Sequence, residues 1–281
     1  MERRHFGWTG IEVALVGQGT WRMGDSATAR TRETEALKLG LELGSTHLDT
    51  AEMYGEGGAE EIVADAIAGR RDEVFLVSKV LPENASRRGT VQACERSLRR
   101  LRTDHLDLYL LHWPSSHPIG ETMAGLEDLV RSGKVRFLGV SNFDVADLRE
   151  AMAALTSERI ACNQVLYNLE TRGIERALIP FCQAHDVAIV GYTPLGKRFP
   201  TRGEAARVLS AVAERHGATP RQVALRFLTR LPGTFAIPKA VGSAHVRENA
   251  AATDFTLSAE DVAAIDAAFP APRRAGPLAT A

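Results

Sequence analysis

The chain has few cysteines, no excess of either charge and no long apolar run, and each absence argues against a class of protein. Its three cysteines among 281 residues are an odd number without paired close spacing, which argues against a disulfide framework and against a zinc site. The 34 basic and 35 acidic residues nearly cancel, so neither nucleic acid nor a membrane surface is the expected partner. No segment reaches the ~20 apolar residues that span a bilayer. We expect a cytoplasmic protein that binds a small molecule.

Short apolar runs alternate with helical patterns along the chain, which indicates parallel strands joined by helices. Strands are predicted at residues 13–19, 47–48, 74–80, 106–111, 135–140, 160–165, 187–192 and 234–237. Helices are predicted at residues 31–43, 59–67, 87–101, 121–132, 144–154, 173–185, 219–230 and 244–252. The segment from Thr219 to Gln222 marks one helix start, with an N-cap, a proline and a capping-box glutamine.

Eight strand and helix repeats predict a closed (β/α)8 TIM barrel, an α/β fold. An open doubly wound sheet is the alternative. Against it, the segment from Gly17 to Arg22 lacks the third glycine and the helix start of a dinucleotide-binding fingerprint. Two segments lie outside the repeat: an N-terminal β-hairpin, expected to cap the barrel floor, and a C-terminal extra helix at 258–269. No linker divides the chain, so residues 1–281 are expected to form one domain.

Ionisable side chains follow three of the predicted strands at the point where each strand ends. Asp49 follows the second strand, Lys79 lies at the end of the third, and His112 follows the fourth. Tyr54 comes five residues after Asp49. Taken singly, each fits an ordinary buried polar residue or a structural ion pair. Because parallel barrels place their active sites at the carboxyl ends of the strands, the four together predict one catalytic site.

Nine motifs in register resemble the aldo-keto reductase family along nearly the whole chain. They are Gly17-x-Gly-Thr-Trp21, Asp49-Thr-Ala-x-x-Tyr54-Gly55, Ser78-Lys79, His112-Trp113, Gly139-Val-Ser-Asn142-Phe143, Asn163-Gln164, Tyr192-Thr-Pro-Leu195-Gly196, Ile237-Pro-Lys239 and Arg247-Glu248-Asn249. Each motif alone occurs often by chance, whereas nine in the same order do not. The resemblance implies an NADPH-dependent carbonyl reductase on a (β/α)8 barrel, with the nicotinamide at the carboxyl ends of the strands.

Carbonyl chemistry gives each of the four side chains a role. Hydride reduction of a carbonyl leaves an alkoxide, which needs a proton donor within hydrogen-bond reach, and Tyr54 is the expected acid. A neighbouring Lys79 ammonium would stabilise the tyrosinate and so lower the pKa of Tyr54. Asp49 is expected to pair with Lys79, because an unpaired buried ammonium is costly. Neutral His112 would donate a ring N–H to the carbonyl oxygen.

The resemblance also implies where NADPH binds, and it implies no metal. Ser141, Asn142 and Gln164 match positions that bind the nicotinamide carboxamide, and Tyr192 matches the ring that stacks on its face. The full set implied to bind the cofactor is Gly19, Thr20, Trp21, Asp49, Ser141, Asn142, Gln164, Tyr192, Thr193, Leu195, Gly196, Ile237, Lys239, Ala240, His245, Glu248 and Asn249. The expected walls of the substrate pocket are Trp21, Met53, Tyr54, His112 and Trp113.

The adenosine end departs from the family pattern at two positions. Lys239 matches the lysine that meets the 2′-phosphate, but Ala240 stands where many members carry serine and His245 where many carry arginine. An arginine makes two charge-assisted bonds to a phosphate, whereas a histidine makes one and is only partly charged near neutral pH. We still expect NADPH to bind better than NADH, by a margin that narrows as the pH rises through the titration of histidine.

The segments that follow the strands are short, so the sequence offers no long loop to build a selective pocket. We expect a monomer with a permissive site for small aldehydes, α-dicarbonyl compounds such as methylglyoxal, or modest ketones. Two alternatives stay open: a lyase or aldolase in which Lys79 forms a Schiff base, and a family member that binds NADPH without turnover. The pairing of Lys79 with Asp49 argues against the first, and the intact set of four residues argues against the second.

Overall fold

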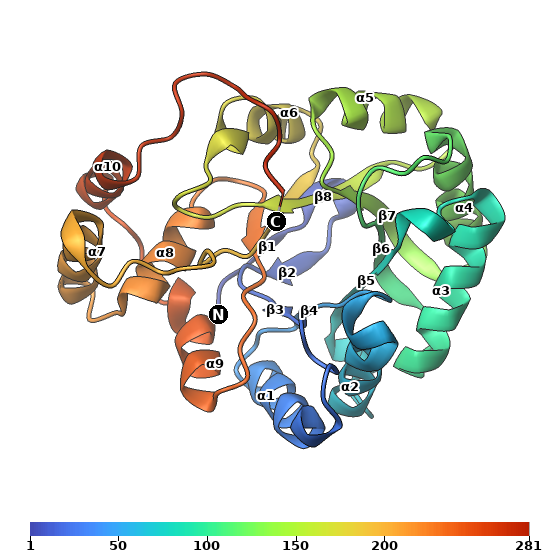
Figure 1. Ribbon diagram of the computed structural model, residues 1–281, viewed down its shortest axis with the longest axis horizontal. Helices are drawn as coiled ribbons and strands as arrows, with labels where there is room; N and C mark the ends of the chain where they lie inside the picture. Colours follow the sequence, from blue (N-terminus) through green and yellow to red (C-terminus); the bar gives the residue numbers. More distant parts are fainter. Residues whose placement is uncertain (281) are drawn as a thin grey trace.

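Eight parallel strands form the central sheet, and helices surround it on the outside (Figure 1). The computed structural model describes residues 1–280. Its barrel strands are β3 (Gln18–Gly19), β4 (His47–Asp49), β5 (Phe75–Val80), β6 (Leu106–Leu111), β7 (Val135–Ser141), β8 (Ile160–Leu166), β9 (Ala188–Tyr192) and β10 (Thr234–Ala236). Their order in the sheet follows their order in the sequence, and every neighbouring pair is parallel.

The sheet closes into a barrel where its first and last strands meet. Val16 and Ala236 form a parallel bridge, and the Gly17 amide donates to the Ala236 carbonyl at 2.8 Å. A Cβ on Gly19 would lie 2.7 Å from the Ile237 carbonyl oxygen, so the close approach of the two backbones requires glycine there. The predicted (β/α)8 barrel is confirmed, and the open-sheet alternative is wrong.

The predicted helices are present on the outside of the barrel, with ends that differ by a few residues. They are α1 (Arg30–Glu42), α2 (Gly58–Ala66), α3 (Arg87–Leu101), α4 (Ile119–Arg131), α5 (Val145–Ala154), α6 (Leu178–Ala184), α8 (Pro220–Leu228) and α9 (Ser243–Ala250). The helix predicted at 173–185 is divided, because a 3-10 turn at Gly173–Glu175 precedes α6. The predicted start at Thr219 is confirmed, since Thr219 and Gln222 cap each other's backbone amides. Within residues 1–280, no helix has both the length and the apolar composition of a membrane span.

One helix was not predicted. Helix α7 (Gly203–Arg215) lies between β9 and α8 and buries Leu209 and Val212. It has no place in a repeat of one helix per strand, although its apolar spacing is helical. The predicted C-terminal helix is α10 (Ala259–Ala268), and it packs against α7, where Asp261 accepts from Arg215 and pairs with His216 (Figure 1).

The N-terminal β-hairpin is confirmed, but the strand predicted at 13–19 is wrong as one element. Strand β1 (Arg3–His5) pairs antiparallel with β2 (Glu12–Ala14), and only β3 belongs to the barrel. The apolar run is continuous, yet its partner changes within it: the Leu15 amide donates to Glu2, whereas the Gly17 amide donates to Ala236. Hydropathy reports burial and gives no information on which strand is the partner.

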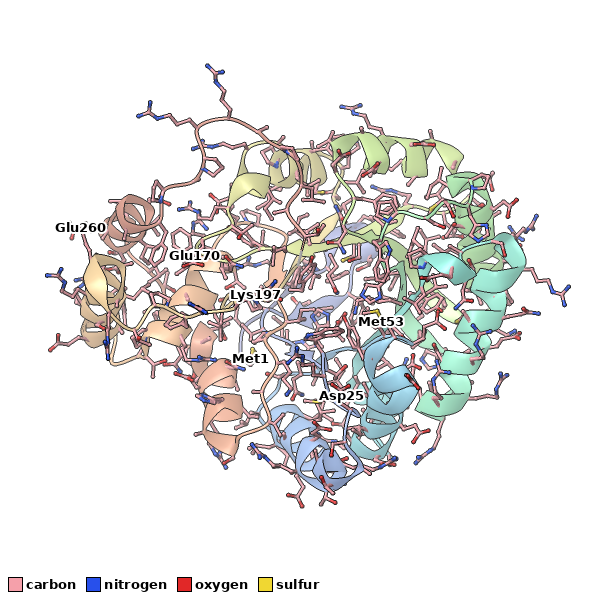
Figure 2. All side chains as sticks on the ribbon, viewed as in Figure 1. Met1, Asp25, Met53, Glu170, Lys197 and Glu260 are labelled. Carbon is pink, nitrogen blue, oxygen red and sulfur yellow. The ribbon has the colours of Figure 1, made fainter. Side chains whose placement is uncertain are left out.

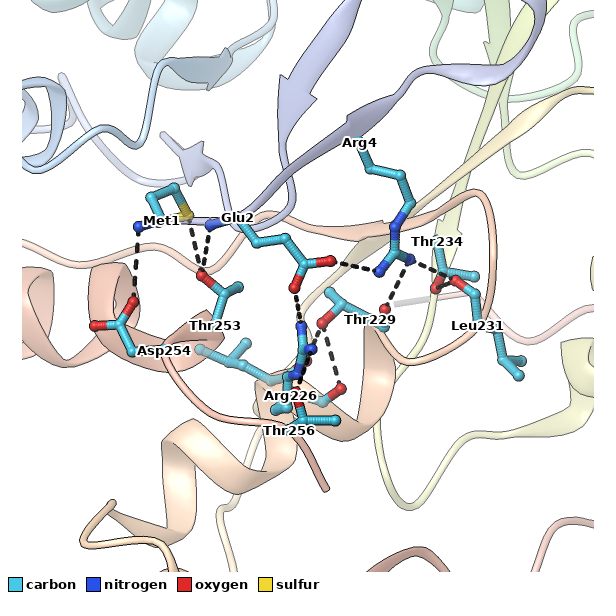
Figure 3. A network of polar contacts seen from close by, with 11 residues as sticks. Met1, Glu2, Arg4, Arg226, Thr229, Leu231, Thr234, Thr253, Asp254 and Thr256 are labelled. Atoms are coloured by element: carbon cyan, nitrogen blue, oxygen red, sulfur yellow. Dashed lines mark hydrogen bonds and ion pairs between the residues drawn. The ribbon is translucent and has the colours of Figure 1, made fainter. Parts of the chain in front are cut away.

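A polar network fixes the hairpin to the last part of the barrel (Figure 3). The Glu2 carboxylate accepts from Arg4 and from Arg226 of α8. The Arg4 guanidinium also donates to the carbonyl oxygens of Thr229 and Leu231 at 3.0 and 2.9 Å. The contacts with Arg226, Thr229 and Leu231 cross more than 200 residues of sequence, so they hold the hairpin against the barrel floor.

His47, at the start of β4, is buried without a polar partner in the floor of the barrel. The rings of Phe6, Phe75 and Phe235 surround it at centroid distances of 6.1, 5.7 and 6.5 Å. Neither ring nitrogen makes a hydrogen bond within the described residues. Burial lowers the pKa of His47 to about 4, so the side chain is neutral at physiological pH.

Protonation of His47 therefore favours the unfolded chain. The pKa of a histidine in an unfolded chain is about 6.5, so between about pH 6.5 and 4 the unfolded state binds a proton that the folded state does not. Stability falls as the pH falls through this window. We expect His47→Leu to reduce the slope of unfolding free energy against pH by about 1.4 kcal/mol per pH unit there. Urea unfolding between pH 4 and 7 measures the slope. The exposed His5→Gln is the control, and an unchanged slope in His47→Leu would contradict the assignment.

Candidate active site

The four predicted catalytic side chains converge at the carboxyl ends of β4, β5 and β6. Asp49 ends β4, Lys79 lies in β5, and His112 follows β6 directly. Tyr54 begins the 3-10 turn Tyr54–Gly57 that leaves β4. Met53, next to this tyrosine, and Lys197, in the segment after β9, lie on two sides of the barrel mouth in Figure 2.

Lys79 is the centre of the group and is fully buried. Its Nζ lies 2.6 Å from Asp49 Oδ1, 2.8 Å from the Thr50 carbonyl oxygen and 3.4 Å from Tyr54 Oη. An ammonium has three donors, and each of these oxygens accepts one. The lysine is thereby fixed between a carboxylate and the phenol.

The electrostatics keep Lys79 charged and Tyr54 protonated. Burial alone would lower the pKa of Lys79, but Asp49 and Tyr54 together outweigh it and the pKa is raised above its ordinary value. Burial raises the pKa of Tyr54, and Lys79 opposes that rise without reversing it. The expected effect of Lys79 on the pKa of Tyr54 is present, but the larger effect of burial, which the sequence pattern did not reveal, leaves the pKa raised overall. Tyr54 is a protonated phenol at neutral pH, as a proton donor must be.

His112 lies beside the phenol and is neutral. Its ring meets the Tyr54 ring edge-on, with a centroid distance of 5.7 Å. Burial, and then the charge of Lys79, lowers the pKa of His112 to about 2. A neutral imidazole carries one N–H donor, so His112 can polarise a carbonyl group without competing with Tyr54 for the role of acid.

Gln164 of β8 joins this group from the opposite side of the barrel. Its Nε2 donates to Asp49 Oδ2 at 2.7 Å, so both carboxylate oxygens of Asp49 are bound, one by Lys79 and one by Gln164. The sequence predicted Gln164 only as a cofactor contact. No local pattern signals the bond, because the two residues are 115 positions apart in the sequence.

The residues predicted at the nicotinamide end form a connected set. Tyr192 donates its hydroxyl to Asn142 Oδ1 at 2.8 Å, and Asn142 Nδ2 donates to the His112 carbonyl oxygen at 3.1 Å. Ser141 Oγ donates to the Gln164 carbonyl oxygen at 2.9 Å. Asn142 and Thr193 have positive φ angles of 60° and 49°, a strained conformation that occurs mainly where a site requires it.

The residues predicted at the adenosine end lie after β10 and on α9. Glu248 is already bound, because its Oε1 accepts from Thr219 at 2.6 Å and its Oε2 lies 3.0 Å from His245 Nδ1. Asn249 Oδ1 is buried and has no hydrogen-bond partner within the described residues. Lys239 is exposed. The exposed Lys239 ammonium can bind a negatively charged group of a ligand, and the buried Asn249 Oδ1 can accept a hydrogen bond from a donor on the same ligand.

The remaining predicted residues also lie at the carboxyl end of the barrel. Trp21 is 52% exposed and meets Tyr54 edge-on at 5.1 Å between centroids, and Trp113 lies 4.8 Å from His112. Thr20 Oγ1 donates to the Asp49 carbonyl oxygen at 3.0 Å. Gly19 ends β3, and the predicted residues that follow β3, β9 and β10 are Thr20, Trp21, Thr193, Leu195, Gly196, Ile237, Lys239 and Ala240. Within residues 1–280, no cluster of three or more histidine, cysteine or acidic side chains is arranged to hold a metal ion.

The family model described as the aldo/keto reductase family matches residues 15–269. The chain belongs to the aldo/keto reductase family. It is 46% identical over 265 residues to methylglyoxal reductase YeaE of Escherichia coli, covering 94% of this chain and 93% of that protein. It is 34% identical over 260 residues to glyoxal reductase of Bacillus subtilis, covering 92% and 90%. An aldo/keto reductase from Klebsiella pneumoniae, crystallised with NADP and acetate, superimposes over the full length of both chains with a TM-score of 0.94 and 43% identity.

The Asp49 and Lys79 pair generates the first test of the site. Removing the carboxylate charge leaves a buried ammonium without its counter-ion, which costs about 3–5 kcal/mol. We expect Asp49→Asn to lower the free energy of unfolding by about this amount. The control is Glu73→Gln, which breaks the exposed ion pair with Arg70 and is expected to change stability little. Equal, small effects of the two substitutions in urea unfolding would show that Lys79 is not a buried charge held by Asp49.

Proposed function

We propose that this chain is an NADPH-dependent reductase of small aldehydes and α-dicarbonyl compounds, with Tyr54 as the general acid. The observation that carries the proposal is the contact of one buried ammonium, that of Lys79, with both Asp49 and the Tyr54 hydroxyl. Neutral His112 lies beside that hydroxyl, so a proton donor and a polarising donor meet at one point. The family, and the relatives named methylglyoxal and glyoxal reductase, support the same chemistry and substrate class.

In this mechanism the residues of the chain orient the carbonyl group and supply its proton. NADPH, when bound, supplies the hydride. His112 donates a ring N–H to the carbonyl oxygen, and Tyr54 transfers its phenolic proton to that oxygen as negative charge develops. The Lys79 ammonium, 3.4 Å from Tyr54 Oη, stabilises the phenolate that remains. Asp49 and Gln164 keep the ammonium in place, and neither touches the substrate in this scheme.

The residues at the two ends of the site fit this cofactor. Asn249 Oδ1 is a buried acceptor without a partner in residues 1–280, and the amino group of an adenine would satisfy it. Tyr192 lies at the carboxyl end of β9, where an aromatic ring can stack on a nicotinamide. Ser141, Asn142 and Gln164 would bind the carboxamide, and Lys239 would meet the 2′-phosphate.

The pocket residues support a permissive enzyme. Trp21 is half exposed and meets Tyr54 edge-on, and the segments that join each barrel strand to the next α-helix have no more than eleven residues. Small carbonyl compounds, and not large rigid ones, suit such an open site. We also propose that residues 1–281 form one domain that acts as a monomer in the cytoplasm. The free cysteines Cys94, Cys162 and Cys182, which are all buried, are compatible with that compartment.

Neither alternative is favoured by the site. A Schiff base requires a neutral lysine amine, and Asp49 raises the pKa of Lys79. A member without turnover would have lost part of the acid machinery, whereas Asp49, Tyr54, Lys79 and His112 are all in contact here.

The assignment of Tyr54 is tested by Tyr54→Phe. We expect the turnover of methylglyoxal with NADPH to fall by about 10²- to 10⁴-fold, because the variant lacks the proton donor, while NADPH affinity changes little. NADPH oxidation measures the first quantity and fluorescence titration the second. The matched control is Tyr109→Phe, which removes a hydroxyl buried in β6. Undiminished turnover in Tyr54→Phe would remove this residue from the mechanism.

Cofactor preference gives a separate prediction that depends on pH. His245 is exposed and its Nδ1 faces Glu248, so its charge is available to a phosphate only while it is protonated. We expect the ratio of the NADH to the NADPH dissociation constant to decrease as the pH rises from about 5.5 to 8, because only a protonated imidazole attracts the phosphate. Isothermal titration calorimetry at both values measures it. A ratio that is the same at both would exclude His245 from phosphate binding.

A further inference from the structure

Arg221 lies in the adenosine end of the site, although the family pattern assigns it no role. It belongs to the first turn of α8. Its Nε is 3.4 Å from Glu248 Oε2, the same oxygen that His245 Nδ1 approaches at 3.0 Å. The two side chains therefore converge on one atom from two different helices. His245 on α9 stands where many family members carry arginine, and Arg221 on α8 approaches the same carboxylate oxygen.

The guanidinium is held in place but its hydrogen-bonding capacity is not used up. Arg221 Nε is buried, yet it makes no hydrogen bond within the described residues, so its contact with Glu248 is electrostatic only. The guanidinium carbon lies 5.6 Å from the centroid of the Phe199 ring, in the segment after β9. About a third of the side chain, 32%, is open to solvent. Because the guanidinium is braced by a ring and a carboxylate while part of the side chain is open to solvent, it is suited to receive an anion.

The carboxylate that holds Arg221 has little capacity left for a ligand. Glu248 Oε1 accepts from Thr219 at 2.6 Å, and Oε2 is shared by His245 and Arg221. The negative charge of Glu248 is thus balanced by Thr219, His245 and Arg221. The net effect is a locally positive site beside the first turn of α9, whose backbone amides carry no side-chain cap and also favour a phosphate.

We propose that Arg221 is the second cationic ligand of the NADPH 2′-phosphate, which it reaches from α8 in place of an arginine on α9. This inference rests on the proposed NADPH dependence. Lys239 provides one charge to the phosphate and Arg221 the other, while His245 contributes only when protonated. Because arginine stays charged at all physiological pH values, Arg221 gives the preference for NADPH a component that does not change with pH.

The test measures how Arg221→Ala and Arg221→Lys bind four ligands: NADPH, NADH, adenosine 2′,5′-bisphosphate and ADP. Isothermal titration calorimetry gives each dissociation constant without any turnover. We expect Arg221→Ala to weaken NADPH and the bisphosphate by about 10- to 100-fold, with NADH and ADP changed by less than about threefold. Arg221→Lys keeps the charge and should retain part of the affinity. Arg207→Ala, on the exposed face of α7, controls for the loss of one positive charge.

Two outcomes would overturn the proposal. Equal losses for all four ligands would assign Arg221 to the adenine or to the fold of this region, and unchanged affinities would leave it only as a partner of Glu248. Circular dichroism and thermal unfolding of both variants identify a folding defect, in which case Arg221→Lys alone decides the question. The affinity of the wild-type chain for NADPH tests the proposed function separately. If the wild-type chain does not bind NADPH, both proposals are overturned. If it does bind and Arg221→Ala leaves the NADPH dissociation constant unchanged, only the role of Arg221 is overturned.

Discussion

The ion pair between Asp49 and Lys79 is the interaction on which the rest of the site depends. A buried ammonium is unfavourable unless it is paired, and here a carboxylate at 2.6 Å and a backbone carbonyl at 2.8 Å compensate for its loss of water. The barrel makes the pairing possible, because Asp49 is paired with Val77 in the sheet, and Lys79 lies two residues further along the same face of β5. Closure of the barrel brings Gln164 from the far side to the second carboxylate oxygen. The phenol of Tyr54 thus meets a cation that cannot move away.

The two ends of the proposed cofactor site are built differently. At the nicotinamide end, Tyr192, Asn142 and the His112 backbone form a continuous chain of hydrogen bonds at one set of strand ends. At the adenosine end, the side chains come from the segment after β10 and from the surface helices α8 and α9, and Lys239 and His245 are exposed. In the proposed function, the residues that carry out the chemistry are therefore buried in the barrel, whereas the residues proposed to set cofactor preference, His245 and Arg221, lie on surface helices.

The sequence was sufficient to predict what local patterns encode. The apolar runs at 106–111 and 135–140, bounded by helical patterns, predicted buried parallel strands, and polar residues at their ends predicted the site. Two contacts between distant residues were not predicted: the bond from Gln164 to Asp49 depends on how the strands curl into a barrel, and the approach of Arg221 to Glu248 depends on how α8 packs against α9. The apolar run at 13–19 could not show that its partner strand changes midway. The lowering effect of Lys79 on the pKa of Tyr54 was predictable, but the burial that outweighs it was not.

The protonation state of Lys79 tests the central claim most directly. Nitrogen-15 NMR of the lysine side chains can resolve it, since the chain contains few others to assign by single substitution: Lys38, Lys134, Lys197 and Lys239. Because Asp49 raises the pKa of Lys79 above 10.5, the account predicts that its Nζ keeps the chemical shift of an ammonium from pH 6 to 10. A transition to a neutral amine within that range would contradict it, and would make Lys79 a nucleophile in place of the cation that supports Tyr54.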